Sequence, residues 1–286
     1  MQNTPTMKII IPTYNAGEGF ALVLDTLLAQ EGVSREDILI IDSSSDDGTD
    51  ERVRERSIQL VTIPKEEFSH GSTRRKAAGL AGDVDYLVFM TQDALPCNEK
   101  SISCLVKFFE QDERIAAVYG RQVPYTQTNA FGRHARLFNY PDVSSVRSFA
   151  DREQYGLKTA FFSNSFGAFR KKVLDQAGGF ADISFCEDVY MAAKLLLDGW
   201  KIGYCAEAEV FHSHSYSVKE EYARYRMIGS FYKEYSWIVD QFGSAENCGF
   251  AYVLDEVKYL VGQGKWFLLP EMAVRMAAKY LGFRLG

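Results

Sequence analysis

The feature that most constrains the fold is a short apolar run between Asp85 and Pro96 that ends abruptly on polar side chains. The run is too short for a helix and predicts a buried strand whose end brings Asp93 to the rim of a sheet. In open α/β sheets, ligands bind beyond the carboxyl ends of the strands, so a carboxylate there is a candidate metal or substrate contact. A simpler hypothesis is that Asp93 caps the helix that begins near residue 98 or 99.

The same order of strand, polar loop and helix recurs through the first hundred residues. Short β-branched runs alternate with stretches whose apolar residues follow the helical period. This alternation predicts right-handed βαβ crossovers and a Rossmann-like, mainly parallel sheet that is covered by helices. The fold class is therefore α/β, and this part of the chain is expected to be a nucleotide-binding half. The expected strands are 7–11, 38–42, 58–63 and 86–93, and the expected helices include 21–28 and 73–81.

The second half of the chain is less regular. The stretch from Arg121 to Lys158 has no clear period and is rich in aromatic and basic residues. Long irregular segments within compact domains are usually functional or mobile, and we expect one of these here. From Lys219 onwards the chain is expected to be mainly helical. Further strands are expected at 115–119, 161–170, 201–205 and 208–214, and a helix is expected to begin at Glu187 and to run through Leu197.

Composition and charge exclude several classes of protein. The chain has 286 residues, 47% of them hydrophobic, and its net charge of −6 argues against a protein that grips nucleic acid by bulk electrostatics. No stretch approaches the roughly 20 apolar residues of a membrane-spanning helix, and no basic leader precedes an apolar core. The five cysteines are odd in number and lack CxxC spacing, which indicates reduced thiols. We therefore expect a cytoplasmic protein or one that is peripheral to the membrane.

Five short segments at the ends of expected strands and helices together resemble the family 2 glycosyltransferases, which have the GT-A fold. These segments are Ile11–Asn15, Ile41–Ser43, Thr73–Arg75, Thr91–Asp93 and Cys186–Asp188. The resemblance covers roughly residues 7–215, and segments 68–74, 89–94 and 210–217 are similar to bacterial rhamnosyltransferases that use dTDP-rhamnose. It implies a catalytic domain at 1–217 followed by a helical extension at 218–286. Within that domain, residues 1–97 would form the nucleotide-binding half and residues 98–217 the acceptor-binding half.

A nucleotide-sugar donor needs a pocket for its base and groups that neutralise its diphosphate. By resemblance, Thr13 and Tyr14 hold the base and ribose and Asp42 accepts the pyrimidine N–H; a plain turn and a helix cap are the alternatives. Arg74 and Arg75 are suited to bidentate contacts with the diphosphate, although the family usually has Asn at position 75. A solvated helix face is the alternative for one of the two. The implied donor-binding residues are Pro12, Thr13, Tyr14, Asn15, Asp42, Arg74, Arg75, Thr91, Gln92 and Asp93.

The metal-binding DxD motif of the family stands here as Thr91-Gln92-Asp93, which keeps only the second acid. Asp93 would then be the principal carboxylate for Mg²⁺ or Mn²⁺, because donor phosphates complete the shell. His212 and His214 alternate along an expected strand and would face the same side. The resemblance suggests a histidine as a further metal ligand here, and a buried hydrogen-bonded pair is the alternative. A hydrolytic zinc site is not expected, because no third His or Cys has matching spacing.

The implied reaction is inverting transfer of a sugar, most simply L-rhamnose from dTDP-rhamnose, to a glycan or lipid-linked glycan acceptor of the bacterial surface. Asp188 is the expected general base and Glu187 its partner, through the match to the ED motif of the family. A pair of acids that complements a helix N-terminus is the alternative. Loss of the first DxD acid would also suit a non-catalytic sugar-nucleotide-binding relative. A nucleotidyltransferase is less suited, because residues 12–15 are not the Gly-rich basic loop of that class.

The C-terminal segment combines apolar bulk with basic residues. A helix at 267–282 would place Leu268, Met272 and Met276 on one side, with Lys279 or Tyr280 beside them. Basic amphipathic helices lie in membrane interfaces, so one hypothesis is peripheral attachment to the cytoplasmic leaflet. The alternatives are packing on the catalytic domain and a homodimer contact.

Overall fold

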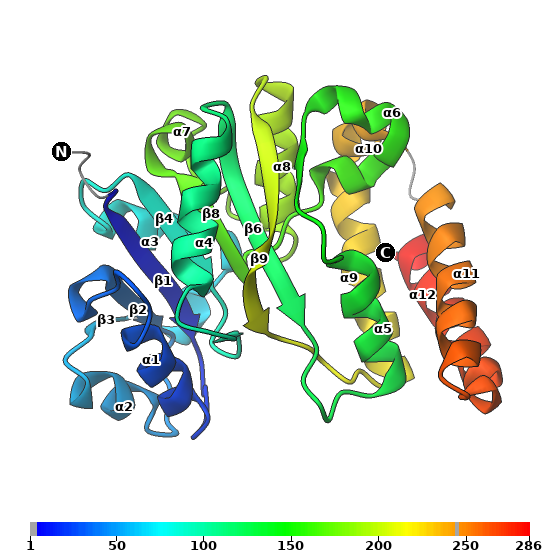
Figure 1. Cartoon of the computed structure of the whole chain (residues 1–286), viewed down its shortest axis with the longest axis horizontal. Coiled ribbons are helices and arrows are strands. Elements are labelled where there is room, and N and C mark those ends of the chain that lie inside the picture. The colour runs from blue at the N-terminus through cyan, green and yellow to red at the C-terminus, as the bar shows by residue number, and fades with distance from the viewer. Residues whose placement is uncertain (1–4, 244–245) are drawn as a thin grey trace.

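The computed structural model describes residues 5–243 and 246–286, except for the side chains of residues 246–248. One mixed β-sheet runs through the centre of the molecule, and the C-terminal helices lie at the end farthest from strand β3 (Figure 1). The strands are β1 Met7–Thr13, β2 Ile38–Asp42, β3 Gln59–Thr62, β4 Tyr86–Met90, β5 Leu95–Pro96, β6 Ile115–Val123, β7 Ser145–Arg147, β8 Phe166–Arg170 and β9 Lys201–Phe211.

The sheet order is β3-β2-β1-β4-β8-β6-β9-β5, and β7 pairs with β9. Strands β3, β2, β1 and β4 are parallel to one another, as are β6 and β9. Strand β8 is antiparallel to both of its neighbours, β4 and β6. The expected α/β class is confirmed, and the N-terminal half is the parallel sheet that the alternating strands and helices predict.

Helices cover both faces of the sheet, which explains why the central strands are apolar without alternation. Every residue of β2 and β4 is buried. One face packs against α1, α2 and α4, and the other packs against α3, α7 and α8. The bounds of these helices are α1 Phe20–Leu28, α2 Thr49–Glu55, α3 His70–Leu80, α4 Ser101–Lys107, α7 Lys171–Gln176 and α8 Glu187–Leu197.

Two expectations for the second half are wrong in detail. The stretch 121–158 is largely structured, because β6 extends to Val123 and the helices α5 Ala130–Asn139 and α6 Arg152–Tyr155 follow. The expected strands 201–205 and 208–214 form the single strand β9. Its pairing with β6 shifts register between Cys205 and Glu209. Because this irregularity interrupts the apolar pattern of the strand, the sequence predicts two strands there instead of one. The strand ends at Phe211, so His212 and His214 lie beyond it.

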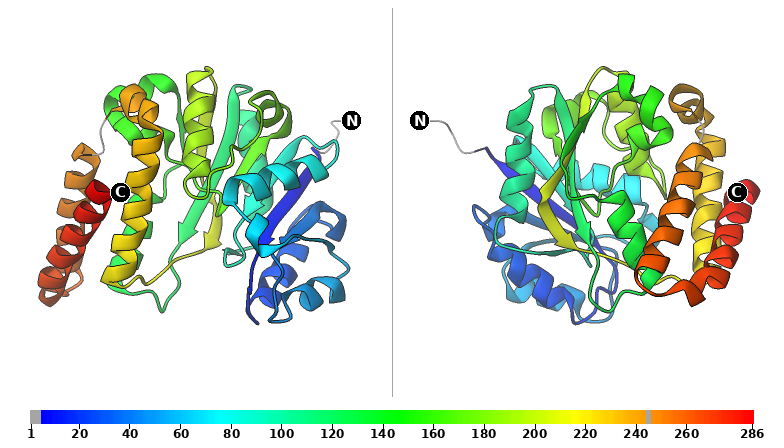
Figure 2. Two further views of the ribbon diagram at one scale, coloured as in Figure 1. Left: turned by 180° about the vertical axis from the view of Figure 1, so that it is seen from behind. Right: turned by 45° about the vertical axis from the view of Figure 1, so that its right-hand side comes forward.

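The C-terminal segment consists of α9 Val218–Glu234, α10 Ser236–Phe242, α11 Glu246–Gly262 and α12 Leu269–Leu285. Helices α9, α11 and α12 lie side by side (Figure 2). Helices α9 and α10 contribute Phe231, Ile238 and Phe242 to the main core. Helices α11 and α12 form a smaller core with α5. The boundary predicted between residues 217 and 218 coincides with the N-cap of α9, and the division into domains stays a prediction.

Helix α12 packs with the face that the sequence singles out, since Met272 is buried and Met276 packs in the smaller core. Two basic residues that support the membrane hypothesis, Arg275 and Lys279, are also buried, and both pair with Glu221 of α9. These two cations are therefore held within the protein and do not face a lipid surface. None of the helices in the described parts of the chain is both long and apolar enough to span a bilayer.

Candidate active site

A pocket of about 290 Å³ opens at the carboxyl ends of β1 and β4, where the topology of an open α/β sheet leaves a crevice. Seven of the predicted donor-binding residues line it, together with Phe68 and His70. The seven are Pro12, Thr13, Tyr14, Arg74, Thr91, Gln92 and Asp93. A larger and more open hollow near Lys8 lies at the amino ends of the strands and is lined by none of the predicted site residues.

The loops after β1 and β2 are tied together by polar side chains. The buried carboxylate of Asp42 accepts hydrogen bonds from the hydroxyl of Thr13 (2.8 Å) and from the backbone N–H of Ser45 (2.9 Å). Asn15 accepts from the backbone N–H of Asp46 across the same gap. Asp42 does not cap α2, since the first N–H of that helix donates to Asp47. Asp42 does not line the pocket itself, but it holds Thr13, which does.

Gln92 holds the loop after β1 against the end of β4. Its amide oxygen accepts from the backbone N–H of Tyr14 (2.9 Å), and its amide nitrogen donates to the carbonyl of the same residue (3.2 Å). The ring of Tyr14 stays partly exposed beneath the ammonium group of Lys65, which lies 4.2 Å from the ring centroid. A free aromatic face beside a cation is suited to a nucleobase and its phosphates.

The two arginines of α3 have different surroundings. Arg74 is buried, and its guanidinium lies 2.9 Å from the carboxylate of Glu187. Arg75 is exposed on the adjacent face of the helix, beside Gly179, and does not line the pocket. Of the two charges that the sequence assigns to the diphosphate, one is therefore paired within the protein and the other lies outside the pocket.

Asp188 lies in the first turn of α8, as the motif predicts. Its two carboxylate oxygens accept from the backbone N–H groups of Asn164 (3.2 Å) and Val189 (2.8 Å). Burial, followed by the charge of Glu187, raises the pKa of Asp188 to about 7, against the opposing effect of these hydrogen bonds and of Arg74. The preceding residue, Cys186, has a left-handed backbone with φ of 66°, which sets the sharp entry to the helix. A carboxyl that titrates near neutrality is suited to general-base catalysis.

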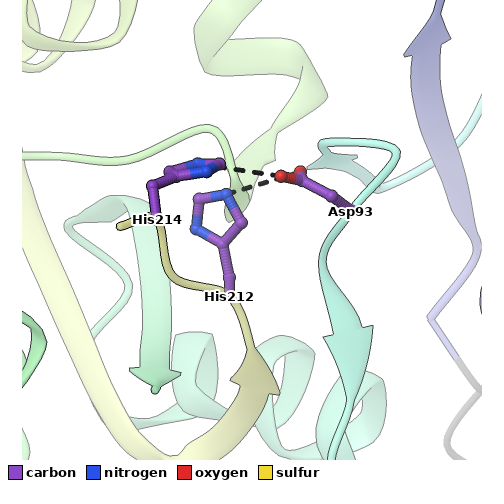
Figure 3. Close-up of side chains that lie close together, drawn as sticks. All are labelled: Asp93, His212 and His214. Atoms are coloured by element: carbon purple, nitrogen blue, oxygen red, sulfur yellow. Dashed lines mark ion pairs between the residues drawn. The ribbon is translucent and has the colours of Figure 1, made fainter. Parts of the chain in front are cut away.

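Asp93, His212 and His214 form a cluster on the other side of the pocket (Figure 3). The Nε2 atom of His212 lies 3.4 Å from one carboxylate oxygen of Asp93, and that of His214 lies 3.7 Å from the other. Antiparallel pairing of β5 with β9 joins the two segments, because it places the residues just after Asp93 beside the end of β9. The cluster is thus built by the sheet, although the two histidines lie past the strand.

The chemistry of these three side chains suits a divalent cation. Burial raises the pKa of Asp93, but the hydrogen bond and charge of His212 outweigh it, so the pKa lies below its ordinary value. Burial lowers the pKa of His212, and it lowers that of His214 to about 4. At neutral pH the cluster is therefore one carboxylate and two neutral imidazoles, with donor atoms within 4.8 Å of one another. Such a mixed oxygen and nitrogen set suits Mn²⁺ better than Mg²⁺, which prefers oxygen alone.

Three residues that the sequence does not single out support these groups. Gln122 is buried at the end of β6, and its amide oxygen lies 2.8 Å from Nδ1 of His212, which leaves Nε2 of that ring to face Asp93. Asn164 contacts both acids at the start of α8, and Arg136 donates to the backbone carbonyl of His212. A polar residue near the end of a strand is a signal that could have identified Gln122, but the strand expected from the sequence stops at residue 119, before it reaches Gln122.

Comparisons with known proteins agree with this geometry. The model of the family described as Glycosyl transferase family 2 matches residues 8–178. The chain is 41% identical to the O-antigen chain rhamnosyltransferase RfbN of Salmonella typhimurium strain LT2, over 98% of this chain and 89% of the relative. It is 38% identical to the O-antigen chain rhamnosyltransferase WbaN of Salmonella anatum, over 99% and 89%. The chain therefore belongs to glycosyltransferase family 2, and the predicted enzyme class is confirmed.

Solved structures show the same fold at low sequence identity. The mannosyltransferase PcManGT from Pyrobaculum calidifontis, in complex with GDP-Man and Mn²⁺, has a TM-score of 0.65 and 17% identity, and the match covers 99% of this chain and 86% of that one. Residues 1–349 of S. aureus TarS, in complex with UDP, have a TM-score of 0.57 and 13% identity, with coverage of 98% and 89%. The expected GT-A architecture is confirmed.

Proposed function

We propose that the protein is an inverting, metal-dependent rhamnosyltransferase that moves L-rhamnose from dTDP-rhamnose to a glycan or lipid-linked glycan during synthesis of a bacterial surface polysaccharide. The names of its relatives support the sugar and the pathway class. The observation that carries the chemistry is the placement of one pocket between two groups. The carboxylate–imidazole cluster of Asp93 lies on one side, and Arg74 links the other side to the acids of α8.

In this mechanism Asp188 removes the proton from the acceptor hydroxyl as the oxygen attacks the anomeric carbon. The bond between that carbon and the diphosphate oxygen breaks at the same time, so no covalent enzyme intermediate forms and the configuration inverts. Glu187 holds Arg74 and raises the pKa of Asp188. A divalent cation held by Asp93, His212 and His214 would offset the charge that develops on the departing diphosphate.

The assignment is tested by incubating the purified protein with Mn²⁺ and a panel of donors: dTDP-rhamnose, UDP-glucose and GDP-mannose. We expect release of dTDP from dTDP-rhamnose and no release after verified removal of metal. NMR of the product should show the anomeric configuration opposite to that of the donor. Faster release from another donor would change the sugar, retained configuration would remove the inverting mechanism, and full activity without metal would remove the role of the cluster.

We further propose that the enzyme works in the cytoplasm at the inner face of the membrane, with a homodimer through the C-terminal helices as the alternative. The cysteines whose surroundings the structure describes carry free thiols, which suits a reducing compartment. Large apolar side chains are exposed along this segment; they are Phe250, Leu254, Val261, Trp266, Phe267, Val274, Leu281 and Leu285. Exposed patches of this kind commonly mark interaction surfaces.

Flotation with liposomes separates these two possibilities. Because Arg275 and Lys279 are buried, they add no charge to such binding, which would depend mainly on the apolar residues. Flotation that the change Trp266→Ser abolishes would support the membrane. Absence of flotation, together with a dimer in analytical ultracentrifugation that Trp266→Ser dissociates, would support the homodimer instead.

A further inference from the structure

One cation of the C-terminal segment lies beside the active site. The guanidinium of Arg224, on α9, lies 4.9 Å from the ring centroid of Phe185 and 5.8 Å from that of Tyr216. The ring of Tyr216 stacks on that of His214 at a centroid distance of 5.1 Å. Phe185 precedes Glu187 by two residues. Arg224 therefore lies between the segment that carries the histidine cluster and the segment that carries the acids.

The charge of Arg224 affects the pKa of a residue in the pocket. Burial is the largest cause of the lowered pKa of His70, which lines the pocket, and the charge of Arg224 adds to that shift. In the part of the chain that the structure describes, this side chain is exposed and forms no ion pair with a carboxylate. Its N–H donors are therefore available to a ligand.

The other arginines near the site are committed to the protein. Arg74 pairs with Glu187. Arg136 donates to the backbone carbonyl of His212. Neither Arg75 nor Arg224 lines the pocket, but Arg224 contacts rings next to the histidines and the acids, whereas Arg75 lies beside Gly179. A departing nucleoside diphosphate carries several negative charges, and guanidinium groups bind phosphate bidentately when their donors are free.

We propose that Arg224 binds the diphosphate of the donor, so that the C-terminal segment completes the donor site. This inference rests on the proposed function, because it assumes a nucleotide-sugar donor. Cation–π contacts with Phe185 and Tyr216 hold the guanidinium in place, and its N–H groups would donate to phosphate oxygens. The segment from residue 218 onwards is then part of the catalytic unit, and its docking on the sheet is needed for donor binding.

Calorimetric titration of the full chain with dTDP and with dTMP, both in the presence of Mn²⁺, tests this contact. The variant Arg224→Gln should bind dTDP about tenfold to a hundredfold more weakly, the range expected for lost charge-assisted hydrogen bonds. Its affinity for dTMP should change less than that for dTDP, because dTMP lacks the second phosphate. Arg224→Lys should recover part of the loss. Arg226→Gln is the matched control, since this exposed arginine lies two residues further along the same helix and points elsewhere.

The inference is overturned if Arg224→Gln binds dTDP as tightly as the wild type does. It is also overturned if Arg226→Gln loses as much affinity, which would indicate a general effect of charge, or if dTMP and dTDP are weakened equally. Unchanged dTDP affinity with a raised KM for the acceptor would place the guanidinium on the acceptor instead. A wild-type protein that binds neither nucleotide would overturn the proposed function itself, and this inference with it.

Discussion

The protein contains two buried clusters of charge that are similar in composition and differ in their neighbours. In the active site, Arg74 of α3 pairs with Glu187 of α8. In the C-terminal segment, Glu221 of α9 pairs with Arg275 and Lys279 of α12. All five side chains are buried. Each cluster joins two helices that are distant in the sequence, so each could be taken for a simple structural clamp.

Burial of charge does not by itself identify a functional site. A buried ion pair often contributes little net stability, because desolvation offsets the attraction. What distinguishes the first cluster is a pocket lined by Arg74 and an adjacent carboxyl whose pKa lies near neutrality. The second cluster lies between helices, and Arg275 also donates to the backbone carbonyl of Tyr216. We therefore expect changes at the first cluster to affect catalysis and changes at the second to affect stability.

The largest effect is expected for Asp188→Asn. An amide preserves the volume of the side chain but takes no proton, so kcat should fall by about 10² to 10⁴, the usual contribution of a general base. The affinity for dTDP should stay near that of the wild type. The control is Asp198→Asn, at the far end of the same helix. Turnover of Asp188→Asn within tenfold of the wild type would remove Asp188 from the mechanism.

The protonation of Asp188 should also make both catalysis and stability depend on pH. The base is active when deprotonated, so kcat/KM of the wild type should rise with pH and level off above about 7. The raised pKa also means that the folded state loses stability as the pH rises from the unfolded value of about 3.9 to the folded value. Asp188→Asn should therefore have a higher Tm than the wild type at pH 8. A lower Tm would show that the charged carboxylate stabilises the fold.

Glu221→Gln should expose the structural role of the second cluster. It leaves Lys279 without its buried anion on α9 and leaves Arg275 only the half-exposed Glu271, so the loss should be at most the roughly 3–5 kcal/mol that removing one partner of a buried pair costs. Urea unfolding measures the loss, and Glu234→Gln, an exposed change on the same helix, should stay within about 0.5 kcal/mol of the wild type. The comparison between the clusters fails if Glu221→Gln is as stable as its control and loses turnover instead.

Gln122→Leu should weaken metal binding without a charge being removed. The amide of Gln122 orients the ring of His212, and loss of such a partner typically costs about tenfold to a hundredfold in metal affinity. Titration of Mn²⁺ followed by electron paramagnetic resonance measures this directly. The exposed change Gln127→Leu is the control. Equal Mn²⁺ affinity in the two variants would show that His212 needs no support from Gln122.

The smallest effect is expected for Glu187→Gln on the pH profile. The charge of Glu187 is the second cause of the raised pKa of Asp188, after burial, so its removal should move the rise of kcat/KM to lower pH. The exposed change Glu153→Gln, remote from the pocket, should leave the profile in place. A profile that stays fixed in Glu187→Gln, or moves to higher pH, would show that Glu187 affects the reaction only through Arg74.

Local sequence patterns are enough to predict the strands and helices and the polar residues at their ends. Short β-branched runs predict buried strands because they are too short to form helices. The polar side chains that follow these runs predict a site at the edge of the sheet. Asp93 is predicted as a site residue in this way, whereas the prediction for Asp188 depends on the match to the ED motif of the family. The class of the fold follows from the alternation of strands and helices, which needs no knowledge of contacts between distant residues.

Which of these residues are free and which are paired depends on contacts in the folded protein. Arg74 meets Glu187 across 113 positions of the chain, and Gln122 meets His212 across 90. Local patterns extend over about ten residues, whereas such pairs depend on the order of the strands and on how the helices dock. For the same reason the sequence places Arg275 on a helix but does not show that it is buried. The physical difference is that secondary structure follows from neighbours along the chain, while burial and ion pairing follow from neighbours in space.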